Sequence, residues 1–99
     1  MRYTVDDIKR IVVPIARQHG VERVWLFGSY ARGEARPESD IDLLIEKGKI
    51  VGYFQLSGFY LELAEALGLE LDLVIREDLW EEFIEQVTRE EILIYDQRT

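Results

Sequence analysis

Two short groups of residues in this sequence are of the kind that handle phosphates and metal ions. Gly28 and Ser29 follow a short apolar segment, and Asp40 and Asp42 stand at the start of another. A glycine lets the backbone approach a phosphate closely, and a serine hydroxyl can donate a hydrogen bond to a phosphate oxygen. Carboxylate oxygens are the ligands that Mg²⁺ and Mn²⁺ prefer. The two groups therefore predict a site for a phosphorylated substrate and a divalent cation.

The Gly-Ser pair stands where a predicted strand runs into a predicted short helix. The strand is expected over residues 23–27, and residues 30–35 suit one or two helical turns. Free amides and the positive end of the helix dipole attract an anion at such a turn. Taken alone, however, the pair is more often a plain helix start that the Ser29 hydroxyl caps.

Asp40 and Asp42 are two residues apart in a segment, residues 40–46, that is expected to form a strand. Side chains at this spacing share one face, with Cα atoms roughly 6.5 Å apart, so both carboxylates can close on the same cations. Adjacent carboxylates repel each other and strands disfavour aspartate, so a bound cation would offset a local cost. A lone pair of this kind could instead be a solvated strand face, or Asp40 could cap a turn. The intervening residues are expected to be buried: Ile41, Leu43 and Ile45.

The spacing between the two groups is more specific than either group. Gly-Ser, ten further residues and then Asp-x-Asp would arise by chance on the order of once per 10⁵ starting positions. With its flanks Leu-Phe-Gly-Ser-Tyr-Ala-Arg-Gly-Glu-Ala and Ser-Asp-Ile-Asp-Leu-Leu-Ile, the signature resembles the nucleotidyltransferases of the DNA polymerase β superfamily. Within that superfamily it looks like the minimal nucleotidyltransferases, the MntA-like antitoxin group, from the first predicted helix to the end of the chain.

This resemblance implies a fold, a reaction and a partner. The fold would be the polymerase β type, and the reaction a Mg²⁺- or Mn²⁺-dependent transfer of AMP from ATP to a tyrosine hydroxyl. The partner would be a HEPN toxin, an all-helical RNase that the antitoxin neutralises in this way. Metals would bridge Asp40 and Asp42 to the triphosphate, while Gly28 and Ser29 hold the β and γ phosphates.

The resemblance also implies a third carboxylate on a later strand, and Asp72 supplies it as a metal ligand and as the general base. Residues 69–76 alternate between apolar and polar, which predicts a strand with Asp72 opposite its leucines. Asp72 can join Asp40 and Asp42 if the two strands are neighbours. An exposed polar residue explains Asp72 as well when the motif is set aside, and Glu70 on the same face matches no family position. The core face of this strand is expected to hold Leu69, Leu71, Leu73 and Ile75.

Other charged and aromatic residues give less specific predictions. Arg32 and Arg36 could each steady a triphosphate through forked hydrogen bonds, or could be surface charges. His19 is predicted to be structural, at a helix end where the dipole favours imidazolium. Four aromatic residues are expected in the core rather than in a base-stacking platform: Trp25, Phe27, Trp80 and Phe83. An acidic set is expected on a solvated helix face, with a patch for a basic partner as the alternative: Glu81, Glu82, Glu85, Glu90 and Glu91.

The remaining elements follow from the spacing of apolar residues and from helix-end signals. Thr4 is expected to cap a first helix that Gly20 ends, and Pro14 to kink that helix or end it early. A helical stripe covers residues 54–67 and ends at Gly68.

A last helix is expected over residues 79–89, capped by Asp78, while residues 92–95 fit either a strand or an extension of that helix. Its apolar side would be Leu79, Trp80, Phe83, Ile84 and Val87. The order of elements predicts an α/β or α+β fold, a small mixed sheet flanked by helices, in a single domain over residues 1–99.

Composition narrows the classes of function. Twenty acidic against twelve basic residues give a formal charge of −8, which argues against tracking along a nucleic-acid backbone, although a single-stranded end at a local site stays possible. The absence of cysteine excludes disulfides, thiolate zinc sites and cysteine nucleophiles. Since no apolar run approaches membrane-spanning length and the start has no signal core, we expect a soluble cytoplasmic protein.

Two other functions stay open at this point. The acceptor could be a small molecule, as for the aminoglycoside nucleotidyltransferases, although those carry extra domains for the acceptor. Alternatively, the chain could be an antitoxin without catalysis that sequesters its partner, although a pure binder would not need three carboxylates.

Overall fold

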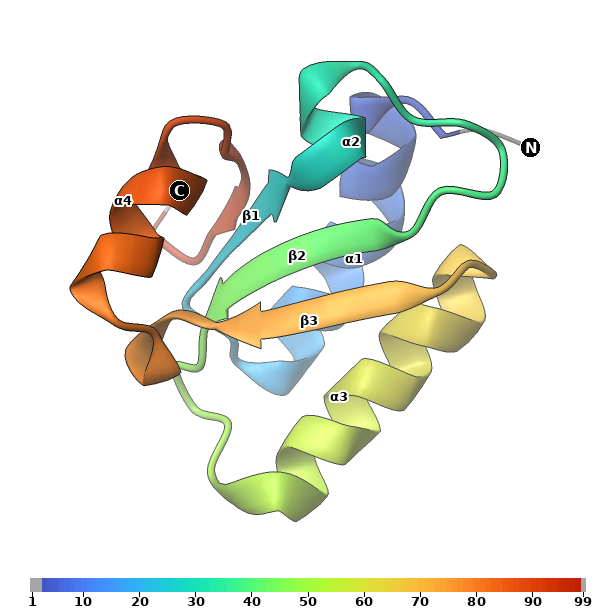
Figure 1. Cartoon of the computed structure of the whole chain (residues 1–99). Coiled ribbons are helices and arrows are strands. Elements are labelled where there is room, and N and C mark those ends of the chain that lie inside the picture. The colour runs from blue at the N-terminus through green and yellow to red at the C-terminus, as the bar shows by residue number, and fades with distance from the viewer. Residues whose placement is uncertain (1–2, 99) are drawn as a thin grey trace.

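The computed structural model describes residues 3–98, apart from the side chains of Val87 and Thr88. Four α-helices, a short 3₁₀ helix and four strands follow one another along this part of the chain (Figure 1). They are α1 (Val5–His19), β1 (Arg23–Phe27), α2 (Gly28–Arg32), β2 (Ile41–Glu46), α3 (Gly52–Leu67), β3 (Leu71–Ile75), η1 (Arg76–Asp78), α4 (Glu81–Thr88) and β4 (Ile92–Asp96).

The strands form one mixed sheet in the order β3-β2-β1-β4. β1 pairs antiparallel with both β2 and β4, while β2 and β3 are parallel because α3 carries the chain back to the same end of the sheet (Figure 1). The fold is therefore the small mixed sheet flanked by helices that was predicted. β3 forms one outer edge of this sheet, and β4 forms the other.

The main core lies between the sheet and the two long helices, α1 and α3. The alternation in β2 is as predicted, because Ile41, Leu43 and Ile45 are fully buried in this core. Burial of such a side chain contributes roughly 1.5–3 kcal/mol to folding. The opposite face of the sheet holds a smaller cluster around Trp25 and Leu44. No helix in residues 3–98 is both long enough and apolar enough to cross a membrane.

The ends of α1 form as predicted, but the helix does not stop at Pro14. Thr4 and Asp7 make a capping box at its start, and Gly20 ends it in the left-handed conformation with φ 74°. The expectation of an early end at Pro14 is wrong, because the helix runs on to His19. Ile15 and Ala16 lie just beyond the proline and are buried in the core, so their packing outweighs the lost backbone hydrogen bond.

The C-terminal part of the chain departs most from the predictions. α4 begins at Glu81 rather than at residue 79, because η1 inserts a turn directly after β3. Leu79 packs on the small cluster, whereas Trp80 is 84% exposed and Phe83 is 45% exposed, so their assignment to the core is wrong. Residues 92–96 form strand β4, which decides between the two alternatives for this segment. The Val87 side chain, expected on the apolar side of this helix, lies outside the described part.

The predicted acidic helix face is only partly present. Glu81, Glu82 and Glu85 lie on α4 and are exposed, but Glu90 and Glu91 come after its last residue. The expectation that all five share one solvated helix face is therefore wrong. One oxygen of Glu91 is buried, and this burial raises the pKa of its carboxyl group.

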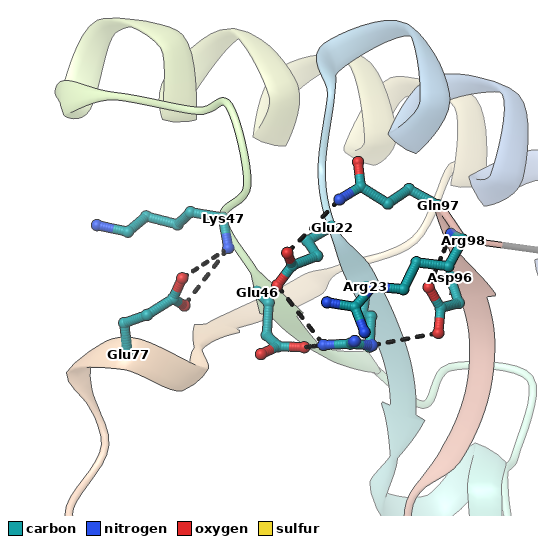
Figure 2. A network of polar contacts seen from close by, with 8 residues as sticks. All are labelled: Glu22, Arg23, Glu46, Lys47, Glu77, Asp96, Gln97 and Arg98. Carbon is teal, nitrogen blue, oxygen red and sulfur yellow. Dashed lines mark hydrogen bonds and ion pairs between the residues drawn. The ribbon is translucent and has the colours of Figure 1, made fainter.

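An ion-pair network ties three strands together at one end of the sheet (Figure 2). Arg23 at the start of β1 contacts Glu46 at the end of β2, and its Nε lies 3.2 Å from Oδ2 of Asp96 in β4. Glu77 in η1 accepts a hydrogen bond from the backbone amide of Lys47, 3.0 Å away, beside this network. The motif residues lie at the opposite end of β1, next to Phe27.

Candidate functional site

The Gly-Ser motif begins α2 directly at the end of β1. Phe27 is the N-cap of this helix, and no side chain caps it. Ser29 lies inside the first turn, so its hydroxyl does not cap the helix as the plainer interpretation of the motif supposed. The predicted helical turns are present but begin two residues earlier and stop at Gly33.

Gly28 and Asp42, from the two halves of the motif, lie against each other. β1 and β2 pair with Phe27 opposite Asp42, which brings the residue after Phe27 to the Asp42 side chain. A β-carbon at Gly28 would overlap Oδ2 of Asp42 and lie 3.0 Å from its Cγ. Gly28 also has a φ of 73°, which side-chain-bearing residues rarely adopt. Glycine is therefore required here both by the backbone and by the neighbouring carboxylate.

Asp72 lies directly beside Asp42, because the two residues are register partners in the parallel pair β2–β3. Asp42 is half-buried, and burial is the first cause that raises its pKa to about 6. The negative charges of Asp72 and Asp40 raise it further, as does a hydrogen bond to Asp72, while the positive charge of Arg32 lowers it. The strand neighbours that the prediction for Asp72 required are thus in place.

Asp40 lies just before β2 and is exposed. A turn precedes it, in which the Ser39 hydroxyl accepts a hydrogen bond from the Arg36 amide at 2.7 Å, and the Ser39 amide donates to the Arg36 carbonyl at 2.9 Å. This turn aims the chain into the strand. Asp40 is close enough for its charge to affect Asp42, so all three carboxylates belong to one electrostatic group.

The chemistry of this group fits a divalent cation. In residues 3–98, no three acidic or imidazole side chains are already gathered into a metal-binding arrangement. The donors are nevertheless hard carboxylate oxygens, and the pKa of Asp42 is raised first by burial and then by the negative charges of Asp72 and Asp40, so its ionised form is disfavoured here. A cation bound between them would remove that cost.

Arg32, the candidate triphosphate ligand, is near the site but paired with two carboxylates. Its Nη1 lies 3.0 Å from Oε2 of Glu90, and its Nε lies 3.3 Å from Oε2 of Glu34. The hydrogen bond to Glu90 is the main reason why the pKa of Arg32 is raised, followed by the bond to Glu34. Sequence spacing carries no signal for the long-range pair with Glu90.

His19 and the buried aromatic residues are structural. His19 Nε2 lies 3.0 Å from Oε1 of Glu62, and its ring packs beside Phe59, and both contacts fit the structural role predicted for it. Trp25 is buried under the guanidinium of Arg76, whose Cζ lies 4.8 Å from the ring centre. The sequence offered no signal for that contact.

Comparisons with known proteins show the family of this chain. A family model described as "Polymerase beta, Nucleotidyltransferase" matches residues 9–99. A candidate protein adenylyltransferase of Methanocaldococcus jannaschii is 44% identical over 70 residues, covering 71% of this chain and 75% of that relative. The protein adenylyltransferase MntA of Thermococcus cleftensis is 30% identical over 95 residues, covering 92% of this chain and 96% of that protein.

Solved structures share the fold. A candidate minimal nucleotidyltransferase superposes with a TM-score of 0.78 at 34% identity, covering 92% of this chain and 96% of that one. A toxin–antitoxin crystal structure with AMP-PNP gives a TM-score of 0.77 at 22% identity, covering 91% of this chain and 74% of that one. The complex of a tri-AMPylated Shewanella oneidensis HEPN toxin with an MNT antitoxin gives a TM-score of 0.72 at 18% identity, covering 96% of this chain and 75% of the matched chain. The last two likenesses concern the fold alone.

Proposed function

This chain belongs to the polymerase β family of nucleotidyltransferases, and on that premise we propose that it transfers AMP from ATP to a hydroxyl group of a protein acceptor. The observation that carries the proposal is the pairing of Asp42 with Asp72 beside Gly28. It joins a carboxylate pair to a tight glycine turn at a helix start, which are the two parts that nucleotidyl transfer needs. The relatives named as protein adenylyltransferases favour a protein as the acceptor.

In the proposed reaction the acceptor oxygen attacks the α-phosphorus of ATP in line with the leaving group. The bond from the α-phosphorus to the bridging oxygen breaks, and pyrophosphate leaves. Asp72 takes the proton of the acceptor hydroxyl, and the turn at Gly28 and Ser29 holds the β and γ phosphates. Most of the rate would come from this positioning.

Asp40, Asp42 and Asp72 would hold the Mg²⁺ or Mn²⁺ ions. When bound, the cation offsets the negative charge on the attacking and leaving oxygens. Arg32 would leave Glu34 and Glu90 to contact the triphosphate, since phosphate offers it the same forked hydrogen bonding that the carboxylates offer. A reaction that uses ATP suits the cytoplasm.

We further propose that the acceptor is a tyrosine of a cognate HEPN toxin, so that the chain acts as an antitoxin. The support is that this fold is found in a solved complex of an MNT antitoxin with a HEPN toxin, and that the toxin in that complex carries AMP. A soluble acidic chain that binds one protein partner is also consistent with the formal charge of −8, which does not suit a nucleic-acid backbone.

The test is transfer of label from [α-³²P]ATP. The chain is incubated with Mg²⁺ and with the purified HEPN-domain protein from the same genome, and that protein is examined for covalent label. We expect label on a tyrosine with the wild type, and none with Asp42→Ala or with EDTA. Binding of the HEPN protein without label would indicate an antitoxin that sequesters its partner, and equal labelling by Asp42→Ala would refute the proposed site.

A further inference from the structure

The outer edge of the sheet next to Asp72 forms an open groove with helix α3. The groove has a volume of about 520 Å³ and lies between β3 and the α3 residues Ser57, Tyr60 and Leu61. Its lining is mostly apolar, with Leu71 and Leu73 from the strand, and it includes Asp72. α3 runs along β3 on this side of the molecule (Figure 1).

The backbone of β3 is arranged for pairing along this groove. The Glu70 carbonyl accepts a hydrogen bond from the Ile41 amide, 2.9 Å away, so Glu70 turns its polar groups toward β2. Backbone amide and carbonyl groups of successive strand residues point to opposite sides, so those of Leu71 and Leu73 point toward the outer edge of the sheet. The Tyr60 hydroxyl confirms this direction, since it donates to the Leu71 carbonyl at 3.2 Å. An extended segment laid beside β3 would meet the amide and carbonyl of Leu73.

The charge around the groove indicates the kind of segment. A neighbouring hollow of about 580 Å³ shares Tyr60 and Leu71 with the groove and adds Glu38 and Glu70. Together with Asp72 these residues make an acidic border, and no described residue that lines either hollow is lysine or arginine. A second copy of this chain, with its formal charge of −8, would be repelled there, whereas a segment with basic flanks would be attracted.

We propose that this groove is the acceptor-docking site: an extended segment of the acceptor protein, with apolar side chains and basic flanks, adds beside β3 and brings its hydroxyl to Asp72. The inference rests on the proposed function, because it uses Asp72 as the group that receives the hydroxyl proton. Main-chain pairing at Leu73 would give affinity, and the apolar floor would select the side chains next to the accepting residue.

The test combines amide exchange with a pair of matched variants. With the HEPN-domain protein from the same genome added, hydrogen exchange should slow at the Leu73 amide and remain unchanged in β4, the opposite edge of the sheet. Leu61→Lys places a cation in the groove, and Phe54→Lys places one elsewhere on α3, where Phe54 is 93% exposed and does not line the groove. We expect Leu61→Lys to weaken binding and to raise KM for the acceptor by about ten-fold or more, with KM for ATP unchanged. Phe54→Lys should leave both within about two-fold.

The outcomes separate this inference from the proposed function. If the HEPN protein binds or is labelled, but the Leu73 amide and the Leu61→Lys variant behave like their controls, the groove is not the docking site and the proposed function stands. If exchange at Leu73 slows as the chain itself is concentrated, the occupant is a second copy and the inference is wrong. If the HEPN protein neither binds nor accepts AMP, the proposed function fails on its own evidence, and the groove proposal fails with it.

Discussion

Asp42 occupies the space that a β-carbon at Gly28 would need, so the turn of the motif and its acidic strand are in direct contact. This contact exists because β1 and β2 pair antiparallel with Phe27 opposite Asp42. The ten residues between the two halves of the motif, 30–39, complete α2 and form the loop that returns the chain to the start of β2. The fixed spacing of the motif thus corresponds to a closed loop between two adjacent strands.

The first prediction concerns Gly28→Ala. The added methyl group must displace the Asp42 carboxylate, and a carboxylate misplaced by about 1 Å is expected to cost about 100-fold in rate. We therefore expect AMP transfer to fall by about that factor or more, measured as labelled acceptor per minute at saturating ATP.

Gly33→Ala is the matched control for this variant. Gly33 has a φ of 75°, close to the 73° of Gly28, but nothing lies within 4 Å of its added β-carbon. Both variants should lose a similar conformational stability of about 1 kcal/mol. A comparable loss of activity in both would show that backbone strain, rather than the contact with Asp42, causes the effect.

The second prediction concerns Asp72→Asn. If Asp72 receives the proton of the acceptor, its loss should lower kcat by about 10²- to 10⁴-fold while ATP still binds. Glu65→Gln provides the control, because Glu65 is also an exposed acidic residue but lines neither the groove nor the neighbouring hollow. Single-turnover labelling measures the effect on chemistry, and titration with a fluorescent ATP analogue measures binding. Similar rates for Asp72→Asn and the wild type would remove Asp72 from the proposed mechanism.

Local sequence signals were sufficient for most of the fold and for the positions of the motif residues. The bounds of β1 and the ends of α1 follow from β propensity, from Thr4 and from Gly20, because these signals act within a few residues. The alternation of apolar residues in β2 correctly separated Ile41, Leu43 and Ile45 from the aspartates. Asp72 could be placed only conditionally, since no local signal tells which strands are neighbours.

The mistaken predictions come from tertiary contacts that spacing does not show. Trp80 was assigned to the core by helical periodicity, but η1 shifts the start of α4 and leaves Leu79 to pack instead. Pro14 was expected to kink α1 or to end it early, and the early end is wrong because buried neighbours carry the helix past it. The pairing of Arg32 with Glu90 depends on how two distant segments meet, and so it could not be predicted.

The third prediction concerns the pH dependence that Asp42 gives to the metal-free protein. Its pKa is about 6 in the folded protein against an ordinary value of 3.8, so the fold favours the protonated form. Its contribution to stability is therefore fully present below about pH 4 and is lost as the pH rises through 6. Asp42→Asn should be more stable than the wild type at pH 8 in EDTA by about 1 kcal/mol. This difference in unfolding free energy is smaller than the full pKa shift would give, because solvent screens a half-exposed carboxylate.

Urea unfolding at several pH values measures this difference. The gap between Asp42→Asn and the wild type should close near pH 4, where Asp42 is protonated in both the folded and the unfolded chain. Adding Mg²⁺ at pH 8 should narrow the gap too. The wild type keeps all three carboxylates, so it should bind the cation more tightly than Asp42→Asn and gain more stability from it. A gap that does not change with pH would mean that the substitution acts through packing instead of charge.

The fourth prediction concerns Asp96, at the end of the sheet away from the motif. A hydrogen bond from the Arg98 amide holds the pKa of Asp96 below its ordinary value, and the ion pair with Arg23 lowers it further. This carboxylate therefore adds stability above about pH 4, and the contribution is lost as the pH falls below that value. Asp96→Asn should lower the melting temperature at pH 7 and should differ less from the wild type as the medium is acidified.

Asp96→Asn and Asp42→Asn should thus have opposite effects on stability at pH 7 to 8. Both substitutions remove one negative charge from an acidic chain, so a general relief of charge repulsion would stabilise both variants alike. Opposite changes in stability arise only if local contacts outweigh net charge. Asp96 accepts a backbone hydrogen bond and pairs with Arg23, whereas Asp42 is half-buried and faces Asp72 and Asp40. A rise in melting temperature for both variants would show that net charge outweighs these contacts. Unchanged AMP transfer by Asp96→Asn would further show that the Arg23 network supports the sheet without contributing to the site.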